Sequence, residues 1–221
     1  MISASIRNEI ETAILDAMHG RGWNYVKSLK AFRKDQEEWT CDCVLNFTNR
    51  KSHLALRTGY YITNKKIILD WKSVAGHVAC TPYIFGGDDM AVAKHMGLNC
   101  SRKSIEQIFL EHESIDKFHL QWIRDLEEIG IPFWEKYCSI DLISHVVNGP
   151  PFDNMPPLAL SGVNRVLRGP LLAYYAKIGK KDMLELLSRY EKISKTIMAK
   201  DMDRDFSGIK NFILEKMKDP A

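Results

Sequence analysis

Three side chains have the types and the spacing of a metal site: His112, Asp116 and His119 lie at positions i, i+4 and i+7. On one unbroken helix these positions share a face, and imidazole and carboxylate groups are common metal ligands. Ser114 favours the start of a new helix between them, which would separate His112 from the other two. A metal-dependent enzyme using His112, Asp116 and His119 is therefore an alternative interpretation, and the sequence predicts no bound cofactor.

A second string of carboxylates resembles the beginning of a calcium loop. Asp201, Asp203 and Asp205 occupy the first three ligand positions of an EF-hand loop. Phe206 stands where that loop needs glycine for its sharp turn, and Phe212 stands where it needs a bidentate glutamate. We therefore expect these acids to lie near the positive N-terminal end of the last helix rather than to bind calcium.

The cysteines favour a reducing compartment. Their number is odd, and they are Cys41, Cys43, Cys80, Cys100 and Cys138. With no signal-peptide pattern at the N-terminus, free thiols and a cytoplasmic location are expected. Cys41 and Cys43 share one face of a predicted strand, but no second pair completes a four-ligand zinc site, so we expect them to pack in the core.

The common catalytic motifs are missing from the sequence. It contains no G-x-S-x-G, H-E-x-x-H, P-loop or G-x-G-x-x-G pattern. Cys138 and His145 are seven residues apart, which is too far on a helix for a direct hydrogen bond. These observations predict a non-enzymatic protein.

The densest patch of one charge sign is acidic. It comprises Asp125, Glu127, Glu128 and Glu135, with Trp134 beside the last of them. Acidic groups with an aromatic neighbour are what an inhibitor offers to a basic protein. We expect these five residues to bind a protein partner.

Basic and aromatic residues alternate over the predicted sheet, which suggests a second alternative. They are Arg50, Lys51, Arg57, Tyr60, Tyr61, Lys65, Lys66, Trp71 and Lys72. A sheet of this composition can stack nucleic-acid bases. The excess of positive charge is small, so nucleic acid is a less favoured partner than protein.

The charge distribution and hydropathy agree with a protein partner. The formal net charge is +3, but residues 101–160 carry 10 acidic and 5 basic side chains, and residues 161–221 carry 8 and 13. An acidic middle flanked by basic ends opposes one continuous nucleic-acid surface. No run of about 18 apolar residues is present, so no membrane association is expected.

Hydrophobic periodicity predicts an α+β fold. Residues 3–19 have the i, i+3/i+4 pattern of an amphipathic helix. From Trp39 to Phe47 the period changes to 2, which indicates a strand with one face in the core and one in water. Residues 25–34, 53–62, 65–72 and 78–85 are also strand-like, and their short connections favour an antiparallel meander of four to five strands.

The second half of the chain is predicted to be helical. Ser101 or Ser104, Ser114 and Ser139 are candidate helix caps, and a helical hairpin turning near Gly179 precedes a last helix over 206–218. We expect residues 1–100 to form the N-terminal helix and sheet. Residues 101–221 are expected to form a C-terminal helical layer packed on it as one compact unit.

Several segments resemble a bacterial domain family that includes immunity proteins of polymorphic toxin systems. The matching residues are Phe32-Arg33-Lys34 with Trp39, then Ile129 to Tyr137 (IGIPFWEKY), and Leu171 to Tyr190. The resemblance covers most of the chain in outline, and no functional residue is carried over from it. It implies a protein that neutralises a toxin domain by covering its active site.

Overall fold

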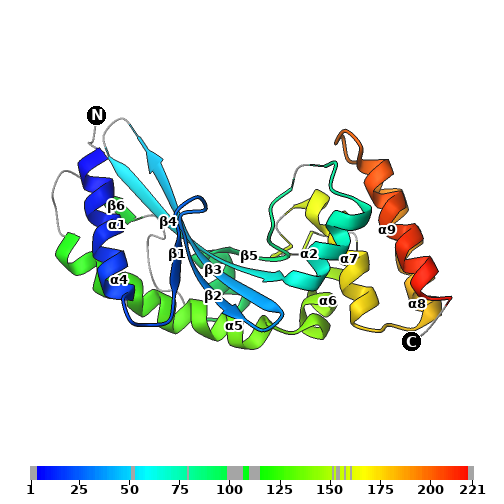
Figure 1. Ribbon diagram of the computed structural model, residues 1–221, viewed down its shortest axis with the longest axis horizontal. Helices are drawn as coiled ribbons and strands as arrows, with labels where there is room; N and C mark the ends of the chain where they lie inside the picture. Colours follow the sequence, from blue (N-terminus) through cyan, green and yellow to red (C-terminus); the bar gives the residue numbers. More distant parts are fainter. Residues whose placement is uncertain are drawn as a thin grey trace. The chain divides into compact units, whose positions relative to one another are not determined.

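The computed structural model describes residues 4–50, 53–78, 80–98, 107–109, 115–150, 152, 155–156, 158–159 and 161–218. The chain has an α+β fold with an N-terminal helix, a sheet and C-terminal helices, as expected (Figure 1). It divides into two compact units, Met1–Ile62 with Gly86–Lys136 and Thr63–Phe85 with Tyr137–Ala221. Each unit therefore takes segments from both sides of residue 100.

One sheet of six strands is present among the described residues. The strands are β1 (Asn24–Val26), β2 (Ala31–Gln36), β3 (Trp39–Asn49), β4 (Leu54–Asn64), β5 (Phe85–Asp88) and β6 (Gln107–Phe109). Their order is β1-β2-β3-β4-β5, and β6 pairs with β4 at Leu54–Leu56. The pairs β1–β2, β2–β3 and β4–β6 are antiparallel.

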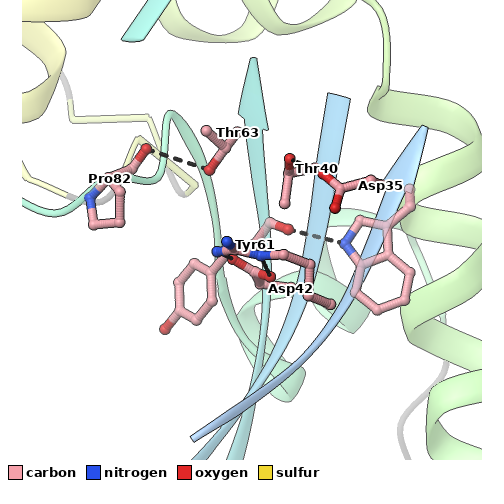
Figure 2. A network of polar contacts seen from close by, with 8 residues as sticks. Asp35, Thr40, Asp42, Tyr61, Thr63 and Pro82 are labelled. Atoms are coloured by element: carbon pink, nitrogen blue, oxygen red, sulfur yellow. Dashed lines mark hydrogen bonds and ion pairs between the residues drawn. The ribbon is translucent and has the colours of Figure 1, made fainter. Parts of the chain in front are cut away.

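From Thr40 to Leu45 the strand β3 is buried on both faces, which corrects the expectation of one wet face there, whereas Asn46 is exposed as expected. Thr40, Asp42 and Val44, on the face expected in water, are at most 9% exposed. Asp42 is fully buried, and Arg33 lies opposite it in register on β2. The Nε and Nη2 groups of Arg33 donate to the two oxygens of Asp42 at 2.8 and 2.7 Å (Figure 2). This bidentate pair satisfies a carboxylate that the sequence pattern placed in solvent.

The helices of the sheet-bearing unit include one long helical path. They are α1 (Ala4–Met18), α3 (Asp89–His95), α4 (Ile115–Asp125), the π-helical turn η1 (Leu126–Gly130) and α5 (Ile131–Tyr137). α4, η1 and α5 follow one another without a break along the sheet (Figure 1). Trp122 of α4 packs its ring 5.6 Å from that of Phe32 and donates from Nε1 to Thr58 Oγ1 at 3.1 Å. These contacts attach the helix to β2 and β4.

Residues 65–72 were expected to be a strand, but they belong to helix α2 (Lys65–Val74). The side chain of Asn64 accepts from the Ile67 N–H at 3.1 Å and so caps the helix. Ile67, Ile68 and Trp71 are buried whereas Leu69 is exposed, which is helical rather than alternating spacing. In the sequence, the consecutive apolar residues Ile67, Ile68 and Leu69 fit a strand as well as a helix, so the helical period was not recognised.

Among the described residues of 78–85, only Phe85 belongs to a strand. Gly86 and Gly87, which were expected to form a loop, continue this strand, β5. Gly86 has φ +140°, and a Cβ there would lie 2.3 Å from the Tyr60 carbonyl oxygen. Glycine therefore allows the backbone of β5 to approach β4 closely. Asp88 then caps α3 by accepting from the Ala91 N–H at 2.8 Å.

Residues 107–109 were expected in a helix, and they form β6 instead. Pairing with the first residues of β4 overrides the helical spacing of this short apolar segment. The candidate caps Ser101, Ser104 and Ser114 lie outside the described residues.

The second unit is helical. It contains α2, α6 (Ile140–Asn148), α7 (Gly162–Tyr175), α8 (Lys180–Ser194) and α9 (Met202–Lys216). The Ser139 cap and the α7–α8 hairpin with its turn at Gly179 are confirmed, and α9 begins four residues earlier than expected. No helix among the described residues has the length and apolar character needed to cross a bilayer.

Two buried ionic side chains bind the backbone of residues 76–78, Thr81 and Tyr83 in the helical unit. Asp205 Oδ2 accepts from the backbone N–H groups of Gly76, His77 and Val78 at 2.9–3.0 Å. Arg168 is 1% exposed, donates to the carbonyls of Thr81 and Tyr83, and lies 4.8 Å above the Trp71 ring. Burial lowers the pKa of Arg168 to about 10.

Candidate functional site

The acidic residues singled out in the sequence lie along the α4–η1–α5 path. Asp125 ends α4, Glu127 and Glu128 lie in η1, and Glu135 lies in α5. Glu127, Glu128 and Glu135 are exposed, and Asp125 is half-buried, where it accepts from Gln121 Nε2 at 2.8 Å. The structure therefore places four carboxylates on one continuous helical support, which we call the acidic helix.

The π-helical turn has a packing cause. Gly130 ends this turn, and a Cβ there would lie 2.7 Å from Cε1 of the buried Tyr60 ring. The missing side chain lets the helix approach β4. Glu127 and Glu128, on the same turn, are both exposed. Arg21 donates to Glu127 at 2.8 Å across the surface.

Trp134 lies inside this unit, at 4% exposure, and not on its surface. Its Nε1 donates to the Tyr61 carbonyl at 3.1 Å (Figure 2). Its ring lies 5.6 Å from that of Tyr60, edge to face, and 5.0 Å from that of Trp23. Trp134 was expected to bind a partner, but its burial means that it packs beneath the acidic helix instead. The other four of the five expected residues are carboxylates, and three of them are exposed.

The proposed metal trio is only partly described. His112 lies outside the described residues, and the side chain of Asp116 is outside them too. His119 is half-buried on α4. Within the described parts of the chain, no three His, Cys, Asp or Glu side chains are close enough to hold a metal ion.

The aspartate string at the start of α9 is divided between surface and interior. Asp201 is the N-cap residue, and Asp203 and Asp205 lie in the first helical turn, as expected. Asp203 is exposed, whereas Asp205 is fully buried on the backbone N–H groups of residues 76–78. No local pattern in the sequence predicts that Asp205 binds the distant backbone of residues 76–78.

Cys41 and Cys43 are buried in β3, which confirms the expectation that they pack in the core. Burial raises the pKa of Cys43 well above its usual value, and the nearby Asp42 adds to this effect. Burial also raises the pKa of Cys80, although the neighbouring Arg168 opposes the shift. Neither thiol has the lowered pKa of a nucleophile.

The basic and aromatic residues proposed for nucleic acid do not form one sheet face. Lys65, Lys66 and Lys72 lie on helix α2 rather than on a strand. Tyr60 and Trp71 are buried, at 0% and 6% exposure, so their rings are covered by protein and cannot stack on bases.

A hollow lined by lysines in the helical unit was not predicted from the sequence. Its volume is about 760 Å³, and residues of α2, α7, α8 and α9 line it. Its basic residues are Lys66, Lys177, Lys180 and Lys216. They lie up to 150 positions apart in the chain, and the only local signal was the cluster of lysines around Gly179.

Comparisons with protein-family models, with curated proteins and with solved structures find no match to this chain.

Proposed function

We propose that the protein is a non-enzymatic binding protein that presents the acidic helix to a basic protein partner. The single observation that carries this proposal is the exposure of Glu127, Glu128 and Glu135 on a helix whose underside is fixed by buried aromatic contacts. A fixed support reduces the entropy lost when a surface is ordered on binding.

The partner class follows from charge and from the resemblance of the sequence to immunity proteins. Carboxylates on a helix complement lysines and arginines, which toxins that act on nucleic acid or phosphate carry around their active sites. The protein would then cover the toxin's active site and exclude its substrate. No residue of this chain takes part in a reaction in that mechanism.

The test begins with the proteins encoded beside this one. Each is expressed alone to find any that stops growth, and a toxic one is then co-expressed with this chain. We expect rescue of growth and a stoichiometric complex. Absence of any toxic neighbour, or a toxic neighbour that neither binds nor is neutralised, contradicts the proposal.

The surface itself is tested by charge reversal. Glu127→Lys combined with Glu128→Lys and Glu135→Lys should slow association and weaken the complex at least about tenfold at low salt, because electrostatic steering is lost. Glu9→Lys combined with Asp16→Lys and Glu38→Lys is the matched control, since these three acids are exposed elsewhere in the same unit and the change in charge is the same. An equal loss in both variants would indicate a general charge effect and remove the acidic helix as the contact surface.

A further inference from the structure

The lysine-lined hollow of the helical unit has the size of a small-molecule site and is open to solvent on one side. Its volume of about 760 Å³ falls within the roughly 300–1,000 Å³ that is usual for ligand pockets. Four helices and the α7–α8 turn contribute to its lining. A concave site of this kind fits a compact ligand better than an extended chain. We call it the lysine pocket.

The charges in the lysine pocket do not balance. Four lysines face one carboxylate, that of Asp70, and the Tyr175 hydroxyl donates to this carboxylate. The ion pairs recorded among the described residues of this unit join other side chains, Arg189 with Glu185 and Lys210 with Glu191. The lining of the pocket therefore carries an excess of positive charge, which favours a negatively charged ligand.

One wall of the lysine pocket is aromatic. The rings of Tyr174 and Tyr175 lie 5.1 Å apart, and those of Tyr174 and Phe212 lie 6.4 Å apart. Lys66 Nζ lies 4.7 Å above the Tyr175 ring, and Lys216 Nζ lies 5.8 Å from the centre of the Phe212 ring. The pocket thus sets cations beside flat apolar surfaces, a combination that suits a ligand with both a ring and negative charge.

The first turn of α8 carries both charge signs. Gly179 has no side chain with which to cap this helix, Lys180 is its first residue, and Asp182 is the acid in its first turn. Asp182 complements the positive end of the helix, and it does not line the pocket. Lys180 lines the pocket and adds one positive charge to its wall.

We propose that the lysine pocket binds a nucleotide, with its phosphates among the lysines and its base against the tyrosine and phenylalanine rings. This site lies on residues other than those of the acidic helix, so the inference goes beyond the proposed protein-binding function. Lys66, Lys180 and Lys216 hold the phosphates, and Tyr174 and Phe212 hold the base.

The ligand class is tested by calorimetric titration of the full chain with ATP, adenosine and inorganic tripolyphosphate. ATP should bind at least about tenfold more tightly than either part alone, because the pocket recognises ring and charge together. Failure to bind ATP at millimolar concentration overturns the proposal. Equal affinity for tripolyphosphate and ATP also overturns it, as does binding of a single-stranded oligonucleotide without binding of ATP.

Variants on one helix locate the site. Lys66 and Lys72 are both exposed lysines of α2, and only Lys66 lines the pocket. Lys66→Glu should weaken ATP binding at least about tenfold, whereas Lys72→Glu should change it less than about twofold. Lys216→Glu, on α9, should also weaken ATP binding at least about tenfold. All three lysines are exposed, so none of the three substitutions changes the core. Equal losses from Lys66→Glu and Lys72→Glu would show a diffuse field rather than a site and overturn the proposal.

Discussion

The ion pair between Arg33 of β2 and the buried Asp42 of β3 joins these two strands. The guanidinium of Arg33 therefore contributes to the free energy of unfolding. Arg33→Ala leaves the fully buried Asp42 carboxylate without its bidentate donor. We expect the free energy of unfolding to fall by about 3–5 kcal/mol, because the desolvation of the charge is no longer offset. Urea denaturation followed by circular dichroism measures the change.

A control on the same strand separates this effect from a general loss of strand stability. Gln36 is exposed on β2, and Gln36→Ala should change the free energy of unfolding by no more than about 0.5 kcal/mol. If Arg33→Ala costs no more than Gln36→Ala, the pair does not stabilise the sheet in the way its geometry indicates.

Two aspartates of one helical turn provide a second comparison. Asp205→Ala removes the acceptor of three backbone N–H groups, and it should lower the free energy of unfolding by about 2–4 kcal/mol. Asp203→Ala, at an exposed position in the same turn, should cost less than about 1 kcal/mol, the usual contribution of an acid near a helix N-terminus. Similar losses in chemical denaturation would refute the anchoring role of Asp205.

The aspartates at 201, 203 and 205 show which properties residue types predict and which they do not. The missing glycine and glutamate were enough to argue against calcium at Asp201, Asp203 and Asp205. Which of them is buried depends on a loop 127 to 129 residues earlier in the chain, and no local pattern records that contact. In the same way, the spacing of Cys41 and Cys43 predicted a core face correctly, whereas the burial of Asp42 between them required knowledge of Arg33 on the neighbouring strand.

At the scale of elements, the π-helical turn of the acidic helix depends on one glycine. Gly130→Ala would bring a methyl group to 2.7 Å from the Tyr60 ring, so the helix or the ring must move. We expect a loss of about 1–3 kcal/mol in the free energy of unfolding, as for other overpacked sites. Thermal or urea unfolding measures it.

The sign of this effect is informative because alanine normally stabilises a helix relative to glycine by about 0.5–1 kcal/mol. Gly162→Ala is the control, since Gly162 lies in α7 and its nearest heavy atom to an added Cβ is 3.7 Å away. Gly162→Ala should be neutral or stabilising. A stabilising Gly130→Ala would mean that the Tyr60 contact does not shape the turn.

The elements that were predicted correctly have a local sequence pattern, such as an apolar stripe or a helix cap. The other elements form through contacts with distant parts of the chain. Helix α1 has an uninterrupted apolar stripe, and Ser139 marks the start of α6 with its own hydrogen bond. Helix α2 contains the apolar run Ile67–Leu69, which fits a strand equally well, and the side-chain cap at Asn64 favours the helix. β5 and β6 form by pairing with β4. Their local sequences alone favour a loop and a helix, and therefore neither strand was predicted.

The turn between α7 and α8 carries a lysine in a conformation that favours glycine. Lys177 has φ +54° and lines the lysine pocket. Lys177→Gly should raise the free energy of unfolding by about 0.5–1 kcal/mol, because glycine adopts this conformation without a steric cost. If the pocket binds a nucleotide, the same change should weaken ATP binding measured by calorimetry.

Lys30, with φ +49°, is the matched control in the sheet-bearing unit. Lys30→Gly should also stabilise the protein, but it should leave ATP binding unchanged because Lys30 does not line the pocket. A Lys177→Gly variant that is stabilised and still binds ATP as the parent chain does would show that Lys177 takes no part in binding.

At the scale of the whole molecule, the helical unit is built from two separate parts of the chain, Thr63–Phe85 and Tyr137–Ala221. Its buried ionic groups depend on both parts. Asp205 needs the N–H groups of residues 76–78, and Arg168 needs the carbonyls of Thr81 and Tyr83. A fragment of residues 137–221 alone would leave both side chains without these partners, at a cost of several kcal/mol each by the usual penalty for buried charges.

We therefore expect the 137–221 fragment to lack a cooperative thermal transition by circular dichroism. The rings of Phe85 and Tyr137 lie 5.1 Å apart, so a Gly/Ser linker of about four residues, with a root-mean-square span of about 11 Å, can join residues 63–85 to residues 137–221. The joined chain regains every contact named above, and it should melt cooperatively. A 137–221 fragment that melts as sharply and at the same temperature as the joined chain would contradict this prediction. Helix packing within 137–221 would then be sufficient for folding, and the contacts of Asp205 and Arg168 with residues 76–78, Thr81 and Tyr83 would not be required.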